Sequence, residues 1–222
     1  MFDRLRKAWG RASDHPAQAA PTDPFAGWAA GQGYAVTGHL AAQFSLRGEF
    51  NGRPWRADRL PPGRPFITGA ELRARADLDL HQELAVMVLN RPLKEALEQQ
   101  AYANYTESLQ TTVDAGQTEE LRWLAMFDEV VWDGASDAFW SCFAVLADRR
   151  EDAALWLDDA LAGLLLGWPE DVPGAETPFT MMLLRGKLYL RMEFQQPDLP
   201  TLAHAVTVLR MACERALALA RA

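Results

Sequence analysis

Cysteine is scarce in this chain: its 222 residues include only Cys142 and Cys213. The two do not form a CxxC pair, and each stands among apolar residues, which predicts small buried side chains rather than a disulfide. The four histidines also lack the spacing of HxxxH or HExxH motifs. We therefore predict no metal site.

Signatures of common catalytic chemistry are missing as well. No GxSxG nucleophile motif occurs. Gly31 and Gly33 lack the third glycine of a dinucleotide-binding fingerprint. The carboxylate pairs lie on polar faces, which predicts solvated ion pairs rather than an acid–base couple. We predict no catalytic residues and no cofactor, and a non-enzymatic protein is favoured over an enzyme.

Long apolar runs are absent. The strongly apolar stretch 160–167 is far shorter than the roughly 20 residues of a membrane span. The first residues also lack the apolar run of a secretory signal peptide. A cytoplasmic location is therefore expected.

Basic residues are outnumbered, at 22 Lys and Arg against 30 Asp and Glu, for a net charge of −8. Several of the basic residues lie within the first eleven positions, so the remaining chain is still more acidic. An acidic body repels a phosphate backbone, and nucleic-acid binding is not predicted.

The first residues predict a basic amphipathic helix, with apolar side chains at i, i+3 and i+7 and cations between them. The candidate contact residues for a partner or a membrane are Phe2, Arg4, Leu5, Arg6, Lys7 and Trp9. A linker with three prolines follows, so residues 1–24 are interpreted as a tethered arm. Such an arm is suited to a partner groove or to weak contact with an anionic membrane surface, and a frayed terminus is the alternative.

Residues 25–112 form a strand-rich half. Phe44, Leu46 and Phe50 alternate with small or polar residues before Asn51-Gly52, and Trp55 continues the pattern. Asn-Gly between two such runs predicts a hairpin with a type I′ turn. Further strands are expected at 66–80 and 84–89, and a helix from about Pro92.

Residues 113–222 predict a strand–helix–hairpin–helix unit. The strand is expected at 139–146, the helix at 151–166 and the hairpin strands at 179–184 and 188–194. Asp198 can cap a final helix. The fold class is α+β, with antiparallel sheet or sheets and helices packed on one face. The two halves can be separate domains, and the alternative is that residues 25–222 form a single domain.

Aromatic residues lie near turns in the first half, and they form a possible ligand site of Trp28, Tyr34, His39 and Trp55. The alternative for these aromatic rings is sheet core.

Two stretches carry a resemblance to other proteins. Phe-Trp-Ser-Cys-Phe-Ala-Val-Leu-Ala-Asp at 139–148 precedes a Leu-rich helix and, at 184–190, Leu-Arg-Gly-Lys-Leu-Tyr-Leu. Leu-Arg-Gly-Glu-Phe-Asn-Gly-Arg-Pro-Trp at 46–55 fits the same pattern, which resembles uncharacterised bacterial domains of unknown function. The chain is also similar to small acidic α+β secretion chaperones, which are typically dimeric. These resemblances imply a bacterial protein without catalytic residues and a possible homodimer.

The resulting hypothesis is a non-enzymatic bacterial binding or adaptor protein, recruited by its N-terminal arm to an unidentified protein partner. The alternative is an enzyme or small-ligand-binding protein with a pocket near the aromatic residues of the first half.

Overall fold

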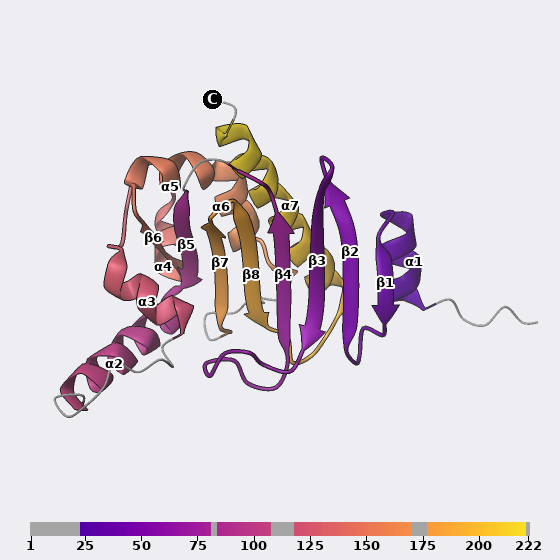
Figure 1. Ribbon diagram of the computed structural model, residues 1–222, viewed down its shortest axis with the longest axis horizontal. Helices are drawn as coiled ribbons and strands as arrows, with labels where there is room; N and C mark the ends of the chain where they lie inside the picture. The colour runs from indigo at the N-terminus through magenta and orange to yellow at the C-terminus, as the bar shows by residue number, and fades with distance from the viewer. Residues whose placement is uncertain (1–22, 81–83, 108–117, 170–176, 221–222) are drawn as a thin grey trace, which may run out of the picture.

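Antiparallel pairing organises the chain around one sheet. The computed structural model describes residues 23–80, 84–107, 118–169 and 177–220, and their strands form an eight-stranded sheet in the order β1-β2-β3-β4-β8-β7-β5-β6 (Figure 1). The strands are β1 Ala35–Gly38, β2 Phe44–Phe50, β3 Arg53–Leu60, β4 Glu71–Asp77, β5 Ala85–Asn90, β6 Phe143–Ala147, β7 Phe179–Leu184 and β8 Lys187–Glu193. Because β4 pairs with β8 and β5 with β7, both halves of the chain contribute to the same sheet.

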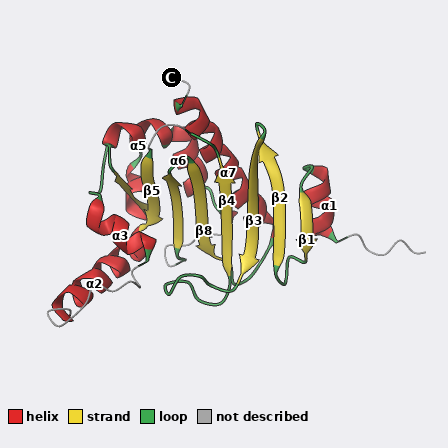
Figure 2. Ribbon diagram, viewed as in Figure 1, coloured by secondary structure: helices red, strands yellow, loops and turns green. Residues whose placement is uncertain are grey.

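Helices flank this sheet, as Figure 2 shows in red against yellow strands. They are α1 Pro24–Gly31, α2 Arg91–Glu107, α3 Glu119–Met126, α4 Asp137–Cys142, α5 Arg150–Trp156, α6 Asp159–Leu166 and α7 Leu199–Leu219. Together with the antiparallel pairing, they confirm the predicted α+β class.

Both predicted hairpin turns are present. Asn51 and Gly52 have φ values of 51° and 74°, and Arg185 and Gly186 have 50° and 69°. Positive φ at both central residues is what a type I′ turn requires, and it matches the right-handed twist of the flanking strands. The first turn joins β2 to β3, and the second joins β7 to β8.

Helix α7 covers one face of the sheet and lies behind it in Figure 1. The predicted cap is present, since the Asp198 carboxylate accepts the Thr201 N–H at 2.7 Å. The buried face of the helix packs on the inward side chains of the strands, with Leu202, Leu209 and Cys213 fully buried. Helices α1, α4, α5 and α6 contribute to the same core.

Helices α2 and α3 pack on the opposite face, over β5, β6 and β7. The strand register places Met87 beside Met182 and Leu146, and Leu97 and Trp123 from the two helices join the same cluster. The expected one-sided arrangement therefore holds for α1 and for α4 to α7. Over β5 to β7 the strands are apolar on both faces, so helices cover both.

The strand expected at 139–146 begins only at Phe143. Residues Asp137–Cys142 instead form α4, whose first turn is capped by Ser136, with its Oγ 3.2 Å from the Phe139 nitrogen. A short apolar run fits a buried helix as well as a strand, and here the serine cap decides the outcome. Cys142 consequently lies exposed, contrary to the prediction, whereas Cys213 is buried as predicted.

The helix expected at 151–166 is two helices. The chain breaks after Trp156, and Asp158 caps α6 by accepting the Leu161 N–H at 3.0 Å. Aspartate is a preferred N-cap residue because its short carboxylate satisfies a free N–H of the first turn. The strand expected at 66–80 is also shorter, since β4 spans only Glu71–Asp77.

Candidate partner-binding face

The uncovered half of the sheet carries charged side chains. On the face that α7 does not cover, the outward side chains of β2, β3, β4 and β8 form a surface that we call the open face. Its cations are Arg47, Arg56, Arg73, Arg75, Lys187 and Arg191, and its anions are Glu49, Asp58, Glu71, Asp77 and Glu193. The same side of β5, β6 and β7 is apolar and lies beneath α2 and α3.

Three arginines of the open face stand side by side on adjacent strands. The register pairs Arg47 with Arg56 and Arg56 with Arg75, and all three are exposed. We call them the arginine row. On the next strand, β8, the residue paired with Arg75 is Tyr189, and its ring centroid lies 5.8 Å from the Arg75 guanidinium carbon. Like charges directly opposite each other destabilise a sheet, so strand pairing alone does not account for this alignment.

Carboxylates flank the arginine row without lying in it. Arg56 contacts Asp58 at 2.6 Å and Arg75 contacts Asp77 at 3.3 Å, each two residues along the same strand. In the described part of the chain, Arg47 forms only a hydrogen bond, 3.4 Å long, to Ser45 and no ion pair. Arg47 is therefore the guanidinium most available to an external anion.

Two adjoining cavities hollow the surface around the arginine row. The larger, which we call the edge cavity, has a volume of about 720 Å³ and is lined by residues 32–35, 47–49 and 54–56. The second, of about 360 Å³, is lined by Pro54, Arg56, Asp58, Arg73, Arg75 and Asp77. Because Pro54 and Arg56 line both, the two cavities adjoin each other at β3.

The edge cavity exists because β1 is shorter than β2. Strand β1 pairs only with residues 44–47 of β2. Before it, Gly33 has a φ of +74°, and the Tyr34 N–H bonds to the carbonyl of Ala29 at 2.8 Å. These contacts turn the chain away from β2, so Gly48 and Glu49 have a strand partner only on the β3 side. The hollow lies beside this free stretch of β2.

Three of the four predicted ligand-site residues come together at this end of the sheet. Trp28 lies 5.8 Å from Tyr34, and Tyr34 lies 4.9 Å from Trp55, measured between ring centroids. Tyr34 and Trp55 line the edge cavity, and Trp28 stands behind Tyr34. His39 is not part of this group, because it follows the far end of β1 and lies exposed beside Asp23 at 3.8 Å.

Burial affects the polar groups of the two aromatic residues that line the edge cavity, Tyr34 and Trp55. It raises the pKa of Tyr34, an effect only partly opposed by Arg210, so the phenol stays neutral at physiological pH. Trp55 is buried, and its indole N–H has no acceptor among the described residues. Trp55 belongs to the core face of β3 and Arg47 and Arg56 to the opposite face, so the residues that line the edge cavity come from both sides of the sheet, with Tyr34 half-buried at its edge.

The predicted arm residues Phe2, Arg4, Leu5, Arg6, Lys7 and Trp9 lie outside the described residues. None of the described helices is long and apolar enough to cross a membrane. Within the described ranges, no three His, Cys, Asp or Glu residues are grouped so that they could hold a metal ion.

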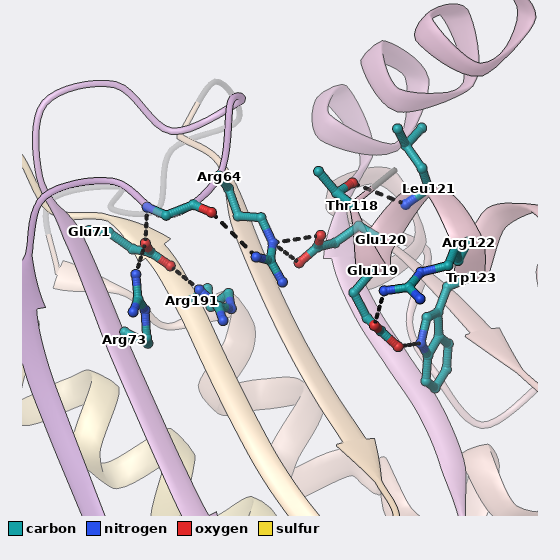
Figure 3. Close-up of polar contacts among 11 residues, drawn as sticks. Arg64, Glu71, Arg73, Thr118, Glu119, Glu120, Leu121, Arg122, Trp123 and Arg191 are labelled. Carbon is teal, nitrogen blue, oxygen red and sulfur yellow. Dashed lines mark hydrogen bonds and ion pairs between the residues drawn. The ribbon is translucent and has the colours of Figure 1, made fainter. Parts of the chain in front are cut away.

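Buried carboxylates hold the β3–β4 loop, residues 61–70, at the border between the open face and α3 (Figure 3). Glu71 is fully buried and accepts hydrogen bonds from the Gly63 N–H at 2.7 Å, from Arg73 at 2.8 Å and from Arg191 at 2.5 Å. Burial acts to raise the pKa of Glu71, but these donors outweigh it, and the pKa lies below its ordinary value. Glu71 is therefore an anion that anchors the loop.

Arg64 of the same loop reaches the first turn of α3. Its Nε lies 2.9 Å and 2.8 Å from the two carboxylate oxygens of Glu120, which is fully buried (Figure 3). Thr68 adds a third attachment through Glu193, which accepts its N–H and its hydroxyl at 2.9 Å and 2.8 Å. The loop thereby borders the open face as a rigid wall.

Comparison with known proteins yields one distant structural similarity. No protein-family model matches the chain, and neither does any curated protein. The crystal structure of the mycobacterial trehalose monomycolate transport factor A, TtfA, aligns with a TM-score of 0.46 and 7% sequence identity, over 85% of this chain and 90% of that one. A similarity this distant carries no functional information.

Sequence reasoning missed the arginine row. The alternation of polar and apolar residues in β2 and β4 does place Arg47 and Arg75 on a polar face. Their alignment with Arg56 depends on the register of three strands, which the sequence pattern of a single strand does not contain.

Proposed function

We propose that this chain is a non-enzymatic binding or adaptor protein, and that it holds its partner on the open face. The observation that carries the proposal is the contrast along one side of the sheet. Over β5, β6 and β7 that side is apolar and covered by α2 and α3, whereas over β2, β3, β4 and β8 it is charged and none of the described helices covers it. A charged face bordered by an anchored loop is suited to recognising a macromolecule of complementary charge.

The state of the carboxylates supports binding rather than proton transfer. A general acid or base needs a pKa near the working pH. Glu71 instead has a lowered pKa because Arg73, Gly63 and Arg191 donate to it. Asp58 and Asp77 each contact an arginine of the row. Glu71 serves as a fixed charge, and Asp58 and Asp77 orient arginine side chains through their contacts.

Site-specific photo-crosslinking in cells tests this proposal. A photoreactive residue at Glu49 on the open face should yield discrete protein adducts, whereas the same residue at the exposed Leu155 on α5 should not. Equal adducts from both positions, or none from Glu49, would rule out the open face as the binding surface.

In this proposal the N-terminal arm recruits the protein, and the open face selects the partner. Deleting residues 1–22, which keeps the α1 N-cap Asp23, should leave the circular-dichroism spectrum and the melting temperature unchanged but change the distribution of the protein in cells. An unchanged distribution would remove the arm from the proposal. Self-association through a sheet edge or a helix face is a further part of it, and light scattering of the full chain measures it directly.

A second candidate function is small-ligand binding in the edge cavity. The specific observation in its favour is a cavity of about 720 Å³, within the size range of ligand pockets, that is lined by Tyr34, Trp55 and Arg47. A thermal-shift screen of aromatic carboxylates tests it. Stabilisation of the wild-type protein that is lost in R47Q supports it, and an equal shift in R47Q contradicts it.

A further inference from the structure

We infer that the arginine row and the edge cavity together bind a short extended acidic segment of a partner protein. This inference rests on the proposed function and adds the chemistry of the partner. Arg47, Arg56 and Arg75 are aligned across three strands, exposed, and adjoined by the two cavities. Asp58 and Asp77 offset the charges of Arg56 and Arg75, whereas Arg47 has no ion pair among the described residues, so a bound anion would relieve the repulsion that remains along the row.

The geometry of the arginine row fits carboxylates carried by an extended chain. Adjacent strands lie about 4.8 Å apart, so three aligned arginines extend over roughly 10 Å. An extended peptide places every second side chain on one side, about 6.8 Å apart. Two acidic side chains with this spacing therefore fit within the length of the row, where their carboxylates can accept hydrogen bonds from the guanidinium groups.

The charges around the arginine row favour a short acidic segment over a nucleic acid. Glu49, Asp58 and Asp77 flank the row, and the whole chain carries a net charge of −8. A long polyanion would extend over these acidic surroundings and be repelled, since its affinity depends on many phosphate contacts. A short segment with two or three carboxylates can stay on the row, where Arg47 has no ion pair among the described residues, and approaches fewer of these acidic groups.

The edge cavity supplies a place for an apolar side chain at one end of this segment. Tyr34 and Trp55 line it, and Gly48 has no side chain to obstruct the aromatic rings. A Cβ at position 48 would lie 2.8 Å from Tyr34 and 2.9 Å from Trp55, so only glycine permits this close packing. The predicted ligand is thus an acidic stretch followed or preceded by an aromatic or large apolar residue.

Fluorescence anisotropy with a defined probe tests the inference. The probe is a short labelled peptide of alternating Glu and Ala that ends in Phe, and its neutral analogue replaces each Glu with Gln. The full-length protein should bind the Glu peptide, bind the Gln peptide at least about tenfold more weakly, and lose affinity as salt is added. Failure to bind the Glu peptide at low salt overturns the inference.

The row variant is R47Q/R75Q, which leaves the Arg56–Asp58 pair intact. Its affinity for the Glu peptide should fall at least about tenfold, because charge-assisted hydrogen bonds are lost. R122Q is the matched control, since Arg122 is an exposed arginine on α3 whose ion pair among the described residues is with Glu119 on the same helix. Equal affinity in R47Q/R75Q and wild type, with both proteins folded, would place the peptide elsewhere and overturn the inference.

Two further outcomes distinguish an error in the inferred partner chemistry from an error in the proposed function. Binding of a single-stranded oligonucleotide in preference to the Glu peptide overturns the inference in favour of a phosphate-bearing partner. If the Glu peptide fails but crosslinks from Glu49 persist, the open face is a binding surface for another chemistry. If both fail, the inference and the proposed function are wrong together.

Discussion

Arg64 and Glu120 form a two-pronged ion pair in which the Arg64 Nε lies 2.9 Å from Oε1 and 2.8 Å from Oε2 of Glu120. The pair joins the β3–β4 loop to the first turn of α3, across a distance of 56 residues in the sequence. It therefore ties the wall of the open face to the helix that covers the apolar half.

Replacing Arg64 with Ala should lower the free energy of unfolding by about 3 to 5 kcal/mol, because Glu120 would remain as a buried charge without its partner. Urea denaturation measures the loss. R122A, which breaks an exposed pair on the same helix, should cost less than about 1 kcal/mol. The double variant R64M/E120L should be more stable than R64A, and an equal or larger loss in the double variant would refute this account.

Acid should destabilise the protein partly through Glu71. Its pKa is lower in the folded than in the unfolded chain, so its contribution to stability is fully present above about pH 4.5 and is lost as the pH falls through the folded pKa. Urea denaturation at neutral pH and near pH 3 should show this loss. E71Q should be less stable at neutral pH and should show a smaller acid-dependent loss. E151Q on α5 is the control, and if E71Q lost as much stability in acid as E151Q, Glu71 would not be responsible.

Gly48 should not tolerate even a methyl group. Because the added Cβ of G48A would lie 2.8 Å from Tyr34 and 2.9 Å from Trp55, the rings must shift, at a cost of about 1 to 3 kcal/mol. G163A is the matched control, since Gly163 lies in α6 with no atom within 4 Å of the added Cβ. G163A should raise the free energy of unfolding by about 0.5 to 1 kcal/mol, and the melting temperature with it. A G48A protein as stable as wild type would show that the rings pack less closely.

The two cysteines should differ sharply in reactivity. Cys142 is exposed at the end of α4, whereas Cys213 is fully buried in α7, where burial raises its thiol pKa. A thiol-reactive dye should therefore modify Cys142 at once in the native protein and Cys213 only after urea is added. Mass spectrometry of the labelled peptides identifies the residue, and rapid native labelling of Cys213 would contradict the packing of α7.

Local turn and cap chemistry was readable from the sequence. Asn51-Gly52 favours the positive φ values of a type I′ turn, the apolar runs on both sides of Arg185-Gly186 indicated the second hairpin, and Asp198 caps α7 through its own side chain. These features depend on a few neighbouring residues. The boundary of β6 was not predictable in the same way, because residues 139–146 are apolar in either conformation and Ser136 outside that run determines where the helix begins.

The candidate site is built by contacts between residues far apart in the sequence, and the pattern of a single segment does not predict such contacts. Trp28, Tyr34 and Trp55 were grouped because they lie near turns, and the structure places them in contact. His39, predicted as part of the same pocket, lies beyond the far end of β1. The arginine row was missed, since aligning Arg47, Arg56 and Arg75 requires the register of strands joined by two different connections.

The order of the strands also bears on how the chain is synthesised. Strand β8 is synthesised after the other seven strands of the sheet, yet it lies in the middle of the sheet between β4 and β7. Until it emerges, β4 has a free edge and Glu71 lacks Arg191, so the nascent chain carries an unpaired strand and an incompletely neutralised carboxylate. Completion of the sheet therefore waits for translation of residue 193, and a prematurely terminated chain would present β4 as an aggregation-prone edge.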